Sequence, residues 1–184
     1  MLAATSLHGP SQMIPLLQAA LLVVFPVMVI VAALRDVTSY TIPNWISGVL
    51  ILAFFPAAFA LGLPLSSIGL HVTTGVAALA AGVAMFALRW IGGGDAKLFA
   101  AAGLWLGWSA APEYLAVTAV AGGALALGLL GLRSMWLRPY VAGAPPWLGR
   151  LATEGENVPY GVAIAVGALA AFPASDIARA WGGF

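Results

Sequence analysis

The chain has 184 residues, of which 62% are hydrophobic and 7% are charged, and its mean hydropathy is +1.04. Soluble domains carry about 25% charged residues, so this composition excludes a soluble protein and predicts an integral membrane protein. The absence of cysteine excludes a disulfide, a thiolate nucleophile and a cysteine-based zinc site. The net charge is +1 and the basic residues are scattered, so we expect no nucleic-acid partner. The two histidines are far apart in sequence, and we expect neither a metal nor a cofactor.

Uncharged apolar runs mark the candidate membrane spans, because roughly 20 helical residues cross the hydrocarbon core of a bilayer. They predict an all-α polytopic fold. Its six transmembrane helices are expected at residues 13–34, 44–63, 68–88, 96–111, 114–132 and 158–174. We expect one integral membrane domain over residues 1–184, with a cytoplasmic loop at 133–157 as its only long connection.

The positions of lysine and arginine indicate the orientation, since short cytoplasmic loops carry the excess of these residues. With the N-terminus outside, six basic residues fall on the cytoplasmic side and only Arg179 falls on the other. The six are Arg35, Arg89, Lys97, Arg133, Arg138 and Arg150. We therefore expect a multi-pass protein of the inner, cytoplasmic membrane.

Two of the six acidic residues, Asp36 and Asp95, lie where a long apolar segment meets a short polar turn. The topology predicts that both lie at the cytoplasmic face. Counted from Asp95, the fourth helix is only about 25 Å long against a core of about 30 Å, so this carboxylate is expected at a semi-apolar edge. Two neighbouring carboxylates there hold one proton between them, so that one activates water and the other donates to a carbonyl oxygen.

Two other classes of protein remain open at this point. A small proton-coupled transporter could use the same carboxylates as a proton relay, although it would more naturally place them near the bilayer midplane. A non-enzymatic scaffold of a secretion complex would need neither aspartate. The position of both acids at one membrane edge favours acid/base chemistry.

Residues 36–44 read Asp-Val-Thr-Ser-Tyr-Thr-Ile-Pro-Asn, and residues 92–97 read Gly-Gly-Gly-Asp-Ala-Lys. These two segments resemble the signatures of type IV prepilin peptidases, the membrane aspartic proteases with a GxGD motif. The stretch Val-Pro-Tyr-Gly at 158–161 is similar to the same family. The resemblance implies an endopeptidase that removes the short basic leader of prepilins, just before their hydrophobic helix, on the cytoplasmic side. It also implies a GxGD aspartic protease-like bundle in which Asp36 and Asp95 are the catalytic pair.

The resemblance also indicates a branch of the family and its partners. Bifunctional members have a cytoplasmic insertion with paired cysteines and a methyltransferase activity, and this chain has neither the insertion nor a cysteine. It is therefore similar to the short, peptidase-only branch that serves Flp-type, tight-adherence pili. The expected partners are an Flp-type prepilin, the lipid bilayer and other pilus assembly proteins.

Several residues around the two aspartates are candidates for binding substrate or shaping the site. Gly92, Gly93 and Gly94 allow unusual backbone conformations, close approach of an extended substrate, or a hinge that moves Asp95, although an interfacial turn explains them too. Asn44, after Pro43, is interpreted as a helix cap that also belongs to the first motif. Lys97 is interpreted first as a membrane-surface anchor and second as a site residue.

The ends of the expected helices suggest a division of roles between the two acids. Asp95 begins one helix, where the helix dipole favours a carboxylate, and Asp36 ends another, where it favours the protonated acid. The hypothesis is therefore that Asp95 is the base and Asp36 the acid in the resting state.

Overall fold

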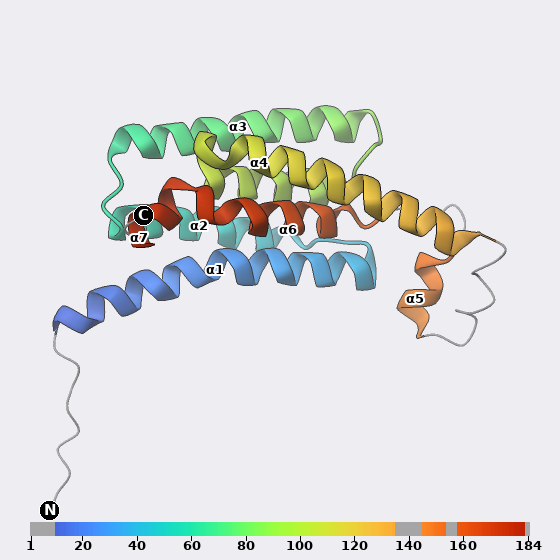
Figure 1. The fold of residues 1–184 in the computed structure, drawn as a ribbon, viewed down its shortest axis with the longest axis horizontal. Helices are drawn as coiled ribbons and strands as arrows, with labels where there is room; N and C mark the ends of the chain where they lie inside the picture. Colours follow the sequence, from blue (N-terminus) through green and yellow to red (C-terminus); the bar gives the residue numbers. More distant parts are fainter. Residues whose placement is uncertain (1–9, 135–144, 154–157, 183–184) are drawn as a thin grey trace, which may run out of the picture.

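The computed structural model describes residues 10–134, 145–153 and 158–182, and every regular element in these ranges is helical (Figure 1). The all-α prediction is therefore confirmed for the described part of the chain. The elements are α1 (Pro10–Ser39), α2 (Asn44–Ala60), α3 (Leu65–Ala87), α4 (Gly93–Arg133), α5 (Pro146–Leu151), α6 (Tyr160–Ala171), the 3-10 turn η2 (Phe172–Ala174) and α7 (Asp176–Gly182). Arg138 and much of the predicted loop 133–157 lie outside the described residues.

The helices form a bundle in which α4 and α6 occupy the middle (Figure 1). α4 packs against α3, α6 and α2, while α1 packs against α2 and α6. Aromatic rings fill the centre: Phe25 of α1 lies 5.3 Å from Trp105 of α4 between ring centroids. The indole N–H of Trp105 donates to the Leu50 carbonyl oxygen at 2.7 Å, so its polar atom is satisfied in the apolar core.

The long helix α4 is broken at Gly107, where φ is 67° and ψ is −179°. This backbone conformation is essentially restricted to glycine. Phe99 and Tyr114 would be about 22 Å apart along one continuous helix, yet their ring centroids are 5.1 Å apart. The chain therefore reverses at Gly107, and the two parts of α4 lie against each other, Gly93–Leu106 before the break and Trp108–Arg133 after it (Figure 1).

This break corrects the predicted boundary between the helices at 96–111 and 114–132. The prediction placed the turn near Pro112, but the chain reverses five residues earlier, at Gly107, and Pro112 lies inside the helix that follows the break. The predicted helix at 158–174 is also subdivided, into α6, η2 and the separate α7. At the other end of the chain, α1 continues to Ser39, so Asp36 lies inside its last turn rather than after it.

Three described helices, α1, α3 and α4, are long and apolar enough to cross a membrane. A fourth candidate arises if α6 with η2 and α7, which are bent by 47°, are taken as one span, and α2 is a shorter apolar helix. These helices describe a multi-pass membrane protein with three to four candidate spans.

Candidate active site

Asp36 is held in place by the first turn of α6. Its side chain projects from the last turn of α1 and is only 4% exposed. The backbone N–H of Gly161 donates to Oδ2 of Asp36 at 2.7 Å. A hydrogen bond from a helix N-terminus is a favourable partner for a carboxylate, so α6 fixes the direction of this side chain.

Asp95 is the third residue of α4 and is 7% exposed. Its Oδ2 accepts a hydrogen bond from the backbone N–H of Gly92 at 2.9 Å, which satisfies one of the amide groups left open at the start of the helix. Its Oδ1 is buried and has no hydrogen-bond partner among the described residues. One carboxylate oxygen therefore anchors the side chain, while the other is a buried acceptor whose hydrogen-bonding capacity is unused among the described residues.

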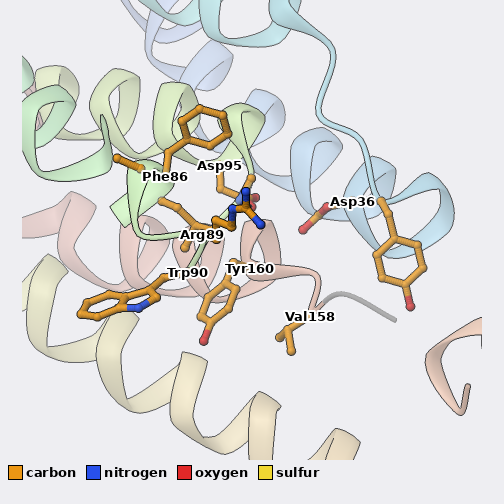
Figure 2. Close-up of a pocket in the computed structure, with 11 residues that line it drawn as sticks. Asp36, Phe86, Arg89, Trp90, Asp95, Val158 and Tyr160 are labelled. Carbon is orange, nitrogen blue, oxygen red and sulfur yellow. The ribbon is translucent and has the colours of Figure 1, made fainter. Parts of the chain in front are cut away.

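Both carboxylates face one pocket of 710 Å³ (Figure 2). They lie close enough for their charges to interact, and the Gly161 amide lies near both. The pocket is lined by the end of α3, the start of α4 and the chain before α6. A smaller cavity of 180 Å³, between residues 40–42 and the three glycines, is also lined by both aspartates. The acid pair therefore borders two neighbouring spaces, which share Asp36, Tyr40, Gly92 and Asp95 in their linings.

The three glycines differ in what surrounds them. None has a positive φ, and Gly92 has φ −74° and ψ 158°, so an unusual backbone conformation is not the reason for glycine here. A Cβ on Gly94 would lie 3.1 Å from both Cβ and the carbonyl oxygen of Ile42, and one on Gly92 would lie 3.1 Å from Oδ2 of Asp95. A Cβ on Gly93 would meet only the Phe86 ring, at 3.6 Å. Close packing therefore accounts for Gly92 and Gly94 but not for Gly93.

The first motif contacts the second through a side-chain pair. Pro43, with φ −61° and ψ 139°, takes the position before α2, and Asn44 is the first helical residue. The prediction of Asn44 as a helix cap is wrong, because Pro43 occupies the cap position and no side chain caps this end. Instead, Oδ1 of Asn44 accepts a hydrogen bond from Nζ of Lys97 at 2.8 Å. Lys97 thus links the start of α4 to the start of α2.

The end of the bundle that carries the acids also carries basic residues. Arg89 lines the 710 Å³ pocket, and Arg150 of α5 donates to the Thr38 carbonyl oxygen at 2.5 Å near the end of α1. The guanidinium of Arg150 also lies 6.0 Å from the centre of the Tyr40 ring. Tyr40 and Arg89 both line the pocket, and both have positive φ values, 51° and 60°. Such conformations are uncommon for residues other than glycine and often occur at functional sites.

Sequence reasoning missed the contribution of Gly161 and Tyr160. The sequence at 158–161 resembles a segment of the family, but nothing in its pattern indicates a contact with Asp36. The structure also changes the argument from helix ends. Asp36 ends α1 but receives the Gly161 amide at the start of α6, so both acids lie at helix N-termini. The helix ends therefore do not assign the acid and the base.

A family model described as the type IV leader peptidase family matches residues 23–127. The chain belongs to the type IV leader peptidase family. The matched range contains Asp36, the Ile-Pro-Asn segment, the glycines and Asp95, and it ends before the segment that carries Gly161.

Two curated relatives are named prepilin leader peptidase/N-methyltransferase, from Burkholderia pseudomallei strains 1026b and K96243. Each relative is 39% identical to this chain over 80 residues, which is 44% of this chain and 20% of the relative. The aligned segment thus spans a fifth of the length of these relatives. No solved structure matches the chain.

Proposed function

We propose that this chain is a membrane-embedded aspartic endopeptidase that removes the leader peptide of prepilins at the cytoplasmic membrane face. Asp36 and Asp95 form the catalytic pair. One observation supports this proposal above the others: two buried carboxylates from α1 and α4 face one pocket, and each is anchored through only one oxygen by a backbone amide. Membership of the type IV leader peptidase family supports it independently.

The chemistry requires one ionised and one protonated aspartate. The ionised member takes a proton from water while the water oxygen attacks the carbonyl carbon of the scissile peptide bond, and the protonated member donates to the carbonyl oxygen. The resulting tetrahedral intermediate collapses when its C–N bond breaks and the departing nitrogen receives a proton from the pair. In this proposal the unpartnered Oδ1 of Asp95 is the oxygen that contacts the reacting water.

A proton-coupled transporter is less well supported than a peptidase. The acids lie at the end of the bundle where α1 and α3 end and α4 and α6 begin. The cavities that they line also contain the glycine segment, where small residues leave room for an extended peptide. A transporter would be favoured by carboxylates halfway along the spans.

The substrate is proposed to be an Flp-type prepilin, and the reaction to be cleavage without methylation. The sequence contains no cysteine, and α1 and α2 are joined by residues 40–43 alone, which leaves no place there for a cysteine-bearing insertion. Mass spectrometry of the cleaved pilin, with S-adenosylmethionine present, tests this assignment. An unmethylated N-terminus is expected, and a methylated one would contradict it.

The topology is proposed to comprise six spans with the N-terminus outside. The reversal at Gly107 supports this topology, because it divides α4 into two antiparallel parts. The six spans are then α1, α2, α3, the two parts of α4, and α6 together with α7. The native chain has no cysteine, so single substitutions report accessibility without background. A thiol reagent that cannot cross the membrane should label Glu113→Cys in intact cells, and Thr153→Cys only after the membrane is opened. The reverse pattern would contradict the orientation.

The central experiment is cleavage of an Flp-type prepilin by the purified protein in detergent. The wild type should release the leader, and Asp36→Ala and Asp95→Ala should not. Glu113→Gln is the matched control, since it removes an exposed carboxylate elsewhere in α4 and should cleave normally. An inactive but folded wild type, or full cleavage by either aspartate variant, would overturn the proposal.

A further inference from the structure

A second cavity of 420 Å³ lies next to the catalytic pocket and differs from it in chemistry. The two spaces share Ile91 and Tyr160 in their linings. No charged side chain lines the second cavity among the described residues, whereas the catalytic pocket contains two carboxylates and a guanidinium. We call the second cavity the apolar groove.

The apolar groove lies between α3 and the second part of α4, and it is also lined by Phe99 of the first part of α4 and by Tyr160 and Ile164 of α6. Ala81 and Met85 form the α3 side. Leu115, Ala119 and Gly122 lie on one face of α4, at helical spacings of four and three residues, and Gly123 extends that face. Small residues on a membrane helix let another helix approach closely. From Leu115 to Gly123 the groove extends about 12 Å, which is about two turns of a helix.

Gly122 of the groove packs against Tyr160, which also lines the catalytic pocket. A Cβ at this position would lie 3.2 Å from Cε1 of Tyr160, the residue that lines both spaces. Tyr160 in turn precedes Gly161, whose amide holds Asp36. A molecule in the groove that contacts Tyr160 would therefore lie next to the bond that the aspartates cleave.

We propose that the apolar groove binds the membrane-embedded apolar helix of the substrate, in the part that adjoins the scissile bond, and that Gly123 limits the bulk accepted there. This inference rests on the proposed function and names a specificity site for it. Three observations favour this occupant: the groove shares Ile91 and Tyr160 with the catalytic pocket, it is lined mostly by apolar and small side chains of candidate spanning helices, and its length fits two helical turns. Gly123 is exposed in the groove, with no atom within 4 Å of the position of an added Cβ.

The first test compares Gly123→Leu with Gly128→Leu. Both glycines have open space at the Cβ position, so neither substitution disturbs packing within the protein. Gly128 lies five residues further along α4, about 140° around the helix, and does not line the groove. We expect Gly123→Leu to lower kcat/KM for full-length prepilin at least tenfold, and Gly128→Leu to stay within twofold of the wild type. An unchanged Gly123→Leu, or equal losses in both variants, would overturn the inference.

The second test asks directly what occupies the groove. A photoreactive benzoylphenylalanine is placed at position 123 or 128 of the Asp36→Asn protein, which should retain the substrate uncleaved. Irradiation in lipid vesicles should link position 123 to the apolar helix of prepilin close to the scissile bond, and position 128 to lipid. Crosslinks from position 123 to lipid alone, or to the basic leader, would overturn the inference. Failure of the wild type to cleave prepilin would instead refute the proposed function, so the two failures are distinguishable.

Discussion

The substitution Gly94→Ala tests whether the glycine segment is needed for close packing. The new Cβ would lie 3.1 Å from both Cβ and the carbonyl oxygen of Ile42, and 3.4 Å from its amide nitrogen. Relaxed contacts between carbon atoms are about 3.5–4.0 Å, so the start of α4 would have to move about 0.5 Å from the 40–43 segment. The neighbouring atoms include backbone next to Pro43, so they cannot swing aside. Asp95 is the next residue and would move with the helix.

The expected effect is a loss of catalysis larger than the loss of stability. A misplacement of about 1 Å can cost about 100-fold in rate, so 0.5 Å corresponds to about tenfold, or about 1.4 kcal/mol of transition-state stabilisation. Gly93→Ala is the matched control, because its Cβ would meet only the Phe86 ring at an ordinary 3.6 Å. Its kcat/KM should stay within about twofold of the wild type.

The assay is prepilin cleavage at several substrate concentrations, with thermal unfolding in the same detergent. Each variant must unfold within a few degrees of the wild type for the comparison to hold as a catalytic effect. Equal activity of Gly94→Ala and the wild type would refute the packing argument. An equal loss in Gly93→Ala would indicate that the segment needs flexibility rather than space, as the hinge interpretation requires.

Three further substitutions test other contacts. Gly161→Ala should lower kcat more than tenfold, because its Cβ would lie 2.9 Å from Oδ2 of Asp36 and displace this carboxylate, and normal cleavage would show that the Cβ is accommodated without moving Asp36. Gly107→Ala should destabilise the protein by at least about 2 kcal/mol, because the backbone conformation is restricted to glycine and the new Cβ would lie 2.8 Å from the His71 ring. Unfolding in detergent measures this loss of stability, and an unchanged midpoint would contradict the reversal at Gly107. Lys97→Met should lower kcat/KM less than about sixfold, because an exposed hydrogen bond contributes at most about 1 kcal/mol, and a loss above tenfold would assign Lys97 a direct role.

The acids could be found from the sequence because charge is rare in this chain. In an apolar sequence Asp36 and Asp95 are conspicuous, and the rule for basic residues places them at one end of the bundle. The structure brings both to one pocket, together with Arg89. Local apolar runs likewise predicted the core of each helix, because hydrophobicity is a property of neighbouring residues.

Contacts between distant segments could not be predicted in this way. The amide of Gly161 reaches Asp36 only because α6 packs against α1, and no local pattern specifies that pairing. The reversal at Gly107 was misplaced because a lone glycine in an apolar helix usually indicates packing, whereas Pro112 is a stronger sequence signal. The buried His71 ring fills the space beside this glycine, which becomes visible only when α3 and α4 are seen together.

The most direct test of the account is whether Asp36 and Asp95 act as one catalytic unit. The measurement is kcat for prepilin cleavage by the wild type, Asp36→Asn, Asp95→Asn and the double variant, all shown to be folded. Residues that act as a unit are strongly non-additive. Each single substitution should therefore lower kcat at least about 1,000-fold, and the double variant should be no slower than the slower single variant. A single variant that retains a tenth of the wild-type rate, or losses that multiply in the double variant, would contradict the shared catalytic role of the two aspartates.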